Sequence, residues 1–263
     1  MSQTFDTSAF IEQTTPRPGQ GEAIQRHNAR VGTPLQGAVQ KMLLLWLLGP
    51  VAWLGLRLLF RVRVLHRERL SAVFPRGILA ARHFFEWDPL VTFYAAGWTS
   101  AFRHPELVGH AIAGRFWMRN WLWRAVSWCL GILGYRPGGE PDEGAVGRAA
   151  DLLDQRRRVM IAVYPTGPIG RSREYRLRPS VGELASRCPA VPILPLTVVG
   201  LQTVRVADVL FLRRPRLTLA LGEAFCAADL PANGEPDTTE AVCARIDAEW
   251  KKLEEGLNAS RGD

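Results

Sequence analysis

Two residues suited to acid–base chemistry lie close together in the segment ARHFFEWDPL, where His83 and Asp88 are separated by four residues. Residues 77–81, shortly before His83, are apolar and typical of a short strand, whereas Asp88 and the proline after it form a good helix start. At such a junction the carboxylate can hold one ring nitrogen while the other takes a proton from an alcohol. The pair therefore predicts general-base catalysis; the alternative is a helix cap beside a surface histidine.

Further motifs follow downstream of this pair. Arg136 ends the apolar stretch LGILGYR, and the residues Tyr164-Pro165-Thr166-Gly167 end a buried stretch that begins VMIAV. Arg171 and Ser172 come shortly afterwards, and a proline-bearing strand at Val191–Pro195 completes the series. In this order and at these separations, the chain resembles the PlsC-type glycerolipid acyltransferases, the 1-acylglycerol-3-phosphate acyltransferase family. The resemblance covers roughly residues 70–225, together with a predicted N-terminal membrane hairpin.

The resemblance implies a role for each motif. His83 is expected to be the general base, oriented by Asp88. Guanidinium groups bind phosphate oxygens in a bidentate manner, which suits a phosphorylated acceptor. The positions that the resemblance assigns to the acceptor and its phosphate are Arg136, Thr166, Gly167, Arg171 and Ser172, with Pro165 and Gly170 shaping the pocket or an oxyanion site.

The implied reaction moves a fatty acyl group from acyl-CoA or an acyl carrier protein to a hydroxyl of a lysophospholipid or related lipid, with no cofactor and no metal. One position departs from the family pattern, because Thr166 replaces a glutamate that helps to position the acceptor. Threonine carries no charge, so the departure favours an acceptor other than lysophosphatidic acid. The alternatives are a non-glycerolipid or secondary-metabolite alcohol, an amine, or a non-catalytic lipid- or carrier-binding member of the fold.

Charge and cysteine content restrict the partners. Lys and Arg total 33 against 25 Asp and Glu, a net charge of +8, which suits anionic lipids or a phosphorylated ligand. Arg213, Arg214 and Arg216 are candidates for contact with anionic lipid or the acyl donor. No nucleic-acid-binding motif is present, so we expect no nucleic acid partner. The four cysteines lie far apart, without zinc spacing, which predicts neither a disulfide framework nor a metal site.

The segment Met42–Phe60 is apolar apart from Arg57 and has Gly49-Pro50 in its middle. Because proline bends or breaks a helix, we predict a hairpin of two short helices, at about 36–48 and 50–60, embedded in one leaflet of a membrane. A single kinked spanning helix and a buried core hairpin are the alternatives. No secretory signal precedes the segment. The expected location is the cytoplasmic side of the inner or plasma membrane, monotopic or single-span, with membrane lipids as partners and the oligomeric state open.

Strands and helices alternate over the rest of the chain, which predicts an α/β fold with a mixed, largely buried sheet flanked by helices. Strands are expected at 60–66, 76–83, 131–136, 159–164, 191–200 and 216–223, and helices at 88–97, 119–129, 143–157, 180–187 and 238–257. The predicted division is a polar flexible tail at 1–34, the membrane hairpin and lead-in strand at 35–66, the catalytic domain at 67–230 and a C-terminal amphipathic helix at 231–263.

Overall fold

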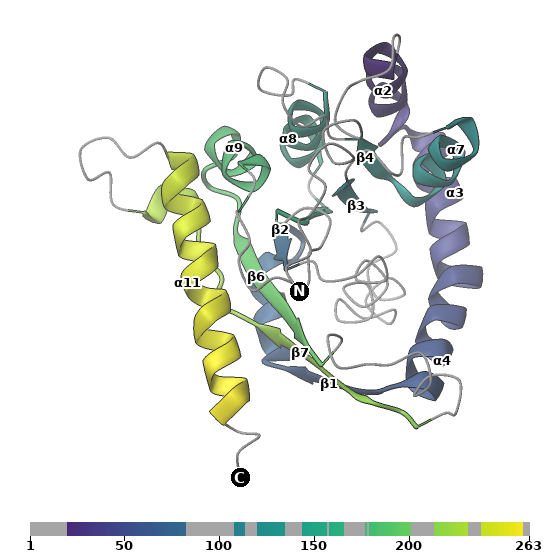
Figure 1. Cartoon of the computed structure of the whole chain (residues 1–263). Helices are drawn as coiled ribbons and strands as arrows, with labels where there is room; N and C mark the ends of the chain where they lie inside the picture. Colours follow the sequence, from purple (N-terminus) through teal and green to yellow (C-terminus); the bar gives the residue numbers. More distant parts are fainter. Residues whose placement is uncertain are drawn as a thin grey trace, which may run out of the picture.

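A mixed sheet organises the fold (Figure 1). The computed structural model describes residues 20–82, 108–113, 120–134, 144–156, 158–165, 177, 179–200, 213–230 and 238–259. Within them, seven strands follow the order β1-β7-β6-β2-β5-β3-β4, and every neighbouring pair is parallel except β6 and β7. The strands are β1 Arg61–Leu65, β2 Arg76–Ala81, β3 Val108–Ala113, β4 Ile132–Gly134, β5 Val159–Val163, β6 Ile193–Val199 and β7 Arg216–Leu221. The predicted mixed sheet is confirmed.

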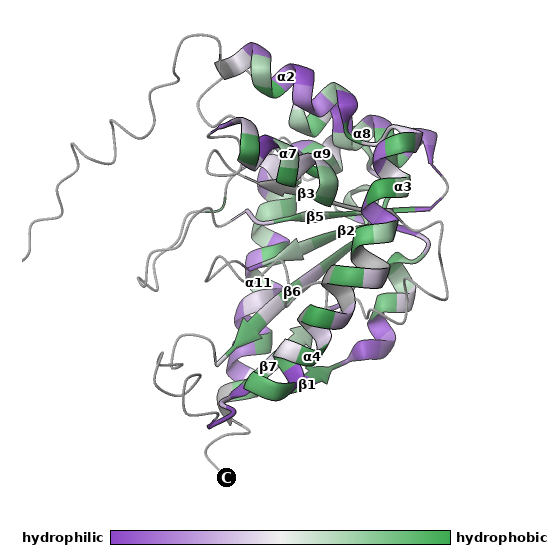
Figure 2. Cartoon of the chain, turned by 90° about the vertical axis from the view of Figure 1, so that its right-hand side faces the viewer, coloured by the Kyte–Doolittle hydropathy of each residue, from purple (hydrophilic) through white to green (hydrophobic). Residues whose placement is uncertain are grey.

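Helices cover both faces of the sheet (Figures 1 and 2). The helical elements are α2 Gln20–Arg30, α3 Pro34–Met42, the π-helix η1 Leu43–Leu48, α4 Gly49–Leu59, the 3-10 helix η2 Arg67–Val73, α7 Trp121–Leu130, α8 Ala145–Gln155, α9 Ser180–Arg187, the 3-10 turn η5 Ala227–Asp229 and α11 Thr238–Ala259. Helices α8, α9 and α11 share one hydrophobic core with the sheet. Residues of α4 and η2 pack in a second core on the other face.

Strand β2 shows why the sheet has two cores. Ile78 and Ala80 belong to the core under α8, α9 and α11, whereas Leu79 and Ala81 belong to the core under α4 and η2. Side chains alternate between the two faces of a strand, so a strand covered on both faces reads as a continuous apolar run. All four residues are no more than 3% exposed. The strand that precedes His83 is therefore fixed from both sides.

Most of the expected elements are present. The predicted strands overlap β1, β2, β4, β5, β6 and β7, and the predicted helices at 119–129, 143–157, 180–187 and 238–257 overlap α7, α8, α9 and α11. The helix expected at 88–97 lies outside the described residues. Strand β3 was not predicted; it is inserted between β5 and β4.

The apolar segment forms one helical column and not the predicted hairpin. Helical structure runs without interruption from Pro34 to Leu59 through α3, η1 and α4, and the column lies along one side of the molecule (Figure 2). Pro50 is accommodated by the wider π turn before it, because that turn relieves the clash of the proline ring with a carbonyl of the preceding turn. Among the described residues, no helix is both long enough and apolar enough to cross a membrane.

Residues 20–34 are not part of a flexible tail. Helix α2 packs against the end of the sheet, where the ring Nε2–H of His27 donates to the carbonyl of Ile132 at 2.8 Å. The Asn28 side chain donates to the carbonyl of Gly134 at 3.1 Å and accepts from its N–H at 2.9 Å. His27 is 7% and Asn28 2% exposed. These side chains bind backbone groups of the edge strand β4, so helix α2 is attached to the sheet where the sequence had predicted part of a flexible tail.

Candidate functional site at the carboxyl edge of the sheet

Four neighbouring parallel strands end in one row. The register pairs Ala80 of β2 with Val163 of β5, Val163 with Ile112 of β3, and Ile112 with Leu133 of β4. In open α/β sheets the crevice outside the carboxyl ends of the strands is the usual place for ligands. This row therefore defines the candidate site.

The predicted site residues follow this row in the sequence. His83 comes two residues after Ala81, the last residue of β2, and Arg136 comes two residues after Gly134, the last residue of β4. Thr166 comes three residues after Val163, the last residue of β5. The topology thus brings together the strand ends from which three separate motifs depart.

Most of the predicted side chains themselves lie outside the described residues. These are His83, Asp88, Arg136, Thr166, Gly167, Gly170, Arg171 and Ser172. Pro165 is described: it is buried in the turn directly after β5. A buried proline restricts the backbone here, because its ring fixes φ.

A buried ion pair holds the last described residue before His83. The Arg82 side chain is 8% exposed and its Nη1 donates to Oε1 of Glu254, which lies on α11 and is 29% exposed. The hydroxyl of Thr197 on β6 donates to the same oxygen at 3.4 Å. The Arg82 N–H also donates to the carbonyl of Leu196 at 2.9 Å. The end of β2 is consequently fixed by a neighbouring strand and by the C-terminal helix.

Sequence reasoning missed Arg82 and Glu254. The signal was present on α11, where Ile246 and Trp250 are fully buried at a spacing of four residues and Glu254 continues that spacing. An acidic residue on the buried face of an amphipathic helix indicates a buried cationic partner. No local pattern identifies that partner, because Arg82 is 172 residues away.

The cysteines near the core are poor nucleophiles. Burial, followed by the charge of Asp154, raises the pKa of the Cys188 thiol. Burial, followed by the charge of Asp229, raises the pKa of the Cys226 thiol. The thiolate is the reactive form, so neither residue is poised for covalent catalysis near neutral pH. In the part of the chain that the structure describes, no group of three or more His, Cys, Asp or Glu side chains is placed to hold a metal ion.

Comparison with known proteins supports the fold at low sequence identity. No protein-family profile matches the chain, and no curated protein matches it. Among solved structures, the fold is similar to the crystal structure of the 1-acyl-sn-glycerophosphate (LPA) acyltransferase PlsC from Thermotoga maritima, with a TM-score of 0.55. The two chains are 15% identical, and the match covers 82% of this chain and 80% of the other. The comparison thus shows that this chain and that enzyme share the arrangement of a central sheet flanked by helices.

Proposed function

We propose that this chain is an O-acyltransferase that moves a fatty acyl group from acyl-CoA or an acyl carrier protein to a hydroxyl of a lysophospholipid or related lipid. His83 acts as the general base and Asp88 orients its ring. The observation that carries the proposal is the common row of strand ends: the His83, Arg136 and Thr166 motifs all depart from it. The fold likeness to an acyltransferase supports the same conclusion.

The proposed mechanism follows from the assigned residues. The histidine takes the proton of the acceptor hydroxyl as the oxygen attacks the thioester carbonyl, and the thiol leaves when the tetrahedral intermediate collapses. Arg136 and Arg171 bind the anionic part of the acceptor, together with Ser172. Thr166 and Gly167 shape that pocket, with Pro165 and Gly170 beside them. Because Thr166 is uncharged, the acceptor is a lysolipid that needs no partner carboxylate at this position.

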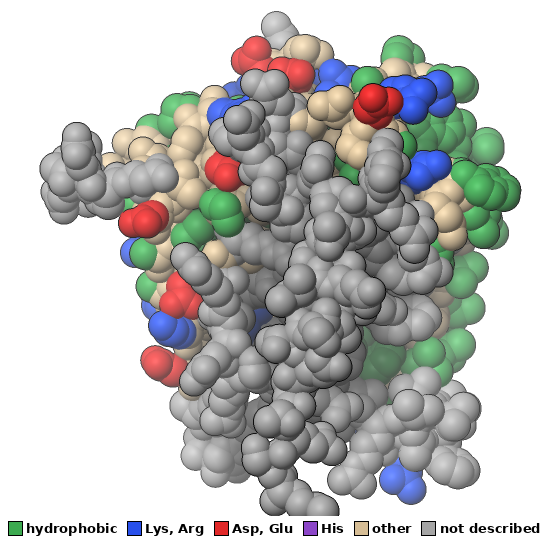
Figure 3. Space-filling view, turned by 45° about the horizontal axis from the view of Figure 1, so that its top comes forward, with side chains coloured by type: hydrophobic (Ala, Val, Ile, Leu, Met, Phe, Trp, Pro, Cys, Tyr) green, Lys and Arg blue, Asp and Glu red, His purple; other side chains and the backbone are tan. Residues whose placement is uncertain are grey.

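We also propose that the protein works at the cytoplasmic face of a membrane. Every large hydrophobic side chain that is exposed in the described part of the chain lies on α3, η1, α4 or the first turn of α7. Trp46 is 75% and Trp121 73% exposed. Hydrophobic side chains gather along this margin of the molecule in Figure 3. Such a patch favours insertion into one leaflet, because tryptophan suits the lipid–water boundary.

The experiment is mass spectrometry of the products formed by detergent-purified protein with acyl-CoA or acyl carrier protein and a panel of lysolipids. A product that forms with the wild type and is lost in His83→Asn would support the proposal. An amine acceptor and a reaction without acceptor would reveal N-acylation and thioester hydrolysis. If no acceptor yields a product while the thioester remains intact, catalysis as proposed is wrong. Co-flotation with phospholipid vesicles tests the membrane proposal separately.

A further inference from the structure

A cavity lined by arginines opens at the start of β1 and β7. Its volume is about 600 Å³, within the range of small-molecule sites. We call it the arginine pocket and define it by Arg57, Arg61, Arg63, Arg214 and Arg216, with apolar walls that include Phe60 and Leu257. The residues come from α4, β1, β7 and α11, so the tertiary fold assembles them.

The positive charges of this pocket are held together against their mutual repulsion. Arg61 of β1 and Arg216 of β7 are direct neighbours in the parallel register, and like charges placed opposite one another destabilise a sheet. None of the five arginines forms an ion pair with a carboxylate in the described part of the chain. The Arg57 guanidinium lies 4.6 Å from the Trp53 ring centroid, and Arg214 donates to the Arg57 carbonyl at 2.7 Å. Neither contact supplies negative charge.

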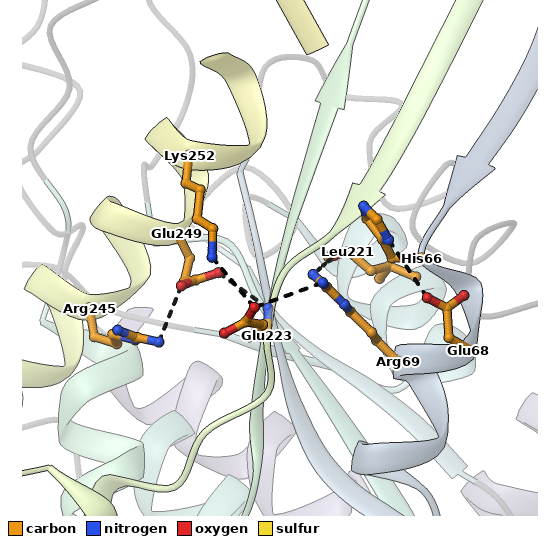
Figure 4. A network of polar contacts seen from close by, with 8 residues as sticks. All are labelled: His66, Glu68, Arg69, Leu221, Glu223, Arg245, Glu249 and Lys252. Carbon is orange, nitrogen blue, oxygen red and sulfur yellow. Dashed lines mark hydrogen bonds and ion pairs between the residues drawn. The ribbon is translucent and has the colours of Figure 1, made fainter. Parts of the chain in front are cut away.

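The other end of the same two strands is arranged differently (Figure 4). There Glu223 lies 3.9 Å from Arg69 and 3.4 Å from Lys252, measured between charged atoms. Glu249 lies 3.2 Å from Arg245 and accepts the N–H of Glu223. Charges at this end are therefore paired within the protein. Among the residues that the structure describes, the arginines at the opposite end have no such carboxylate partner, and this arrangement suits the binding of an anion.

The arginine pocket lies on the same side of the sheet as the candidate site. Ala81 of β2 is level with Leu196 of β6, which is level with Leu221 of β7. Because β7 is antiparallel to β6, its first residues and those of β1 extend beyond the end of β2. The lateral separation of β7 from β2 is two strand spacings, about 10 Å. On α11, Leu257 of the pocket is one helical turn beyond Glu254, which holds Arg82.

We propose that the arginine pocket binds the phosphate groups of a coenzyme A-bound acyl donor. This inference rests on the proposed function and names its donor. Five arginines that line one concave cavity suit a compact polyanion such as the 3′-phosphate and diphosphate of coenzyme A. The apolar walls offer contacts for the adenine ring, and the long pantetheine arm spans the distance to the thioester. Arg136 and Arg171 follow β4 and β5, so the acceptor approaches from the other side of β2.

The charge distribution favours coenzyme A over a lipid headgroup. A bilayer presents its phosphates dispersed in a plane, whereas the pocket concentrates its arginines on two adjacent strands and on the segments that directly precede them. Both ligands share phosphate chemistry, so the experiment has one arm for each. The probes are free coenzyme A, dephospho-coenzyme A and vesicles of phosphatidylglycerol.

The test compares a pocket variant with a control of equal charge. The pocket variant is Arg61→Gln/Arg63→Gln/Arg216→Gln, and the control is Arg26→Gln/Arg67→Gln/Arg187→Gln, at exposed positions elsewhere. Titration calorimetry should show the Kd for coenzyme A raised roughly tenfold or more in the pocket variant. The control should bind like the wild type. Dephospho-coenzyme A should bind wild type more weakly, and the pocket variant should not distinguish the two ligands.

The outcomes separate this inference from the proposed function. Binding is measured without acceptor, and His83→Asn should bind coenzyme A like the wild type even though it transfers no acyl group. Wild type that binds coenzyme A through the pocket but forms no product would contradict only the proposed catalysis. An unchanged Kd in the folded pocket variant would overturn the inference. Loss of phosphatidylglycerol binding with unchanged coenzyme A binding would assign the pocket to lipid headgroups and overturn it as well.

Discussion

The two ends of the β1–β7 strand pair differ in whether their charged side chains have partners of opposite charge. At the ends of the strands, Glu223 and Glu249 pair with Arg69, Arg245 and Lys252 (Figure 4). At the beginnings of the same strands, the arginine pocket contains cations without a carboxylate among the described residues.

The difference between the two ends indicates that one end contributes to stability and the other to ligand binding. Charges that are paired internally stabilise the attachment of α11 to the sheet, whereas charges left without partners cost stability and persist where a ligand supplies the opposite charge. At the paired end, Leu221 is level with Ala81, the last residue of β2, whereas the first residues of β1 and β7, which line the arginine pocket, lie beyond the end of β2. Substitutions at the two ends should therefore have effects of opposite sign on stability.

The largest effect is expected from Glu254→Gln, beside the candidate site. It removes the Glu254 charge from the buried Arg82 guanidinium, and we expect a loss of about 2 kcal/mol, reduced from the ~3–5 typical of broken buried pairs because Glu254 is partly exposed. We also expect kcat to fall while the KM values stay near those of the wild type, because the end of β2 loses a constraint. Urea denaturation and steady-state kinetics measure both effects. Glu255→Gln, exposed at the next position, is the control.

At the paired end, Glu249→Gln should cost about 1 kcal/mol. The glutamine can still accept the Glu223 N–H, but the ion pair with the half-exposed Arg245 is lost. The unfolding free energy from urea titration is the measurement, with the exposed Glu240→Gln as reference. Equal stability of the two variants would remove the argument that this network anchors α11.

In the arginine pocket, Arg61→Gln should leave stability unchanged or raise it, by up to ~0.5 kcal/mol, because it removes repulsion from Arg216. Added salt should reduce the difference between wild type and variant, since salt screens exposed charges. Thermal melts at low and high ionic strength test this. A clear loss of stability in the variant would mean that Arg61 has a structural role, and the contrast between the two ends would fail.

The smallest effect is expected at His27, a buried histidine whose protonation is opposed by burial. Burial lowers the pKa of His27 below the ordinary value of 6.5, and its hydrogen bond to Ile132 only partly opposes this. The unfolded chain therefore binds the proton more readily than the folded chain. The contribution of neutral His27 to the free energy of unfolding is fully present above pH 6.5 and is lost as the pH drops below that value. Unfolding free energies at neutral and mildly acidic pH should show a smaller acid loss in His27→Gln than in wild type.

Local patterns predicted the elements that are covered on both faces. Strands β2, β5 and β6 are apolar runs bounded by polar residues, and α9 carries a clear amphipathic pattern, so their positions could be predicted. Strand β3 has Gly109 and His110 at its centre and owes its structure to its neighbours β5 and β4. Helix α2 is polar and is held by side-chain hydrogen bonds to β4, which hydrophobic periodicity does not detect.

The candidate site was predictable to a different degree. The motif residues were assigned from the resemblance of their types and order to a known family, and apart from Pro165 they lie outside the described residues, so their roles stay predictions. The Arg82–Glu254 pair and the arginine pocket were not predictable as units, since each joins segments far apart in the sequence. The sequence indicated Arg214 and Arg216 as anion contacts. Only the parallel pairing of β1 with β7 places Arg61 and Arg63 beside them.

The most direct test of the account is the rate of acyl transfer in His83→Asn compared with His66→Asn. Both substitutions replace a histidine by a residue that cannot accept the proton, and His66 lies at the paired end of β1, 3.6 Å from Glu68. The account predicts a rate lower by about 10²–10⁴ in His83→Asn, the range expected for loss of a general base, and an unchanged rate in His66→Asn. Product formation by folded His83→Asn at the wild-type rate would contradict it.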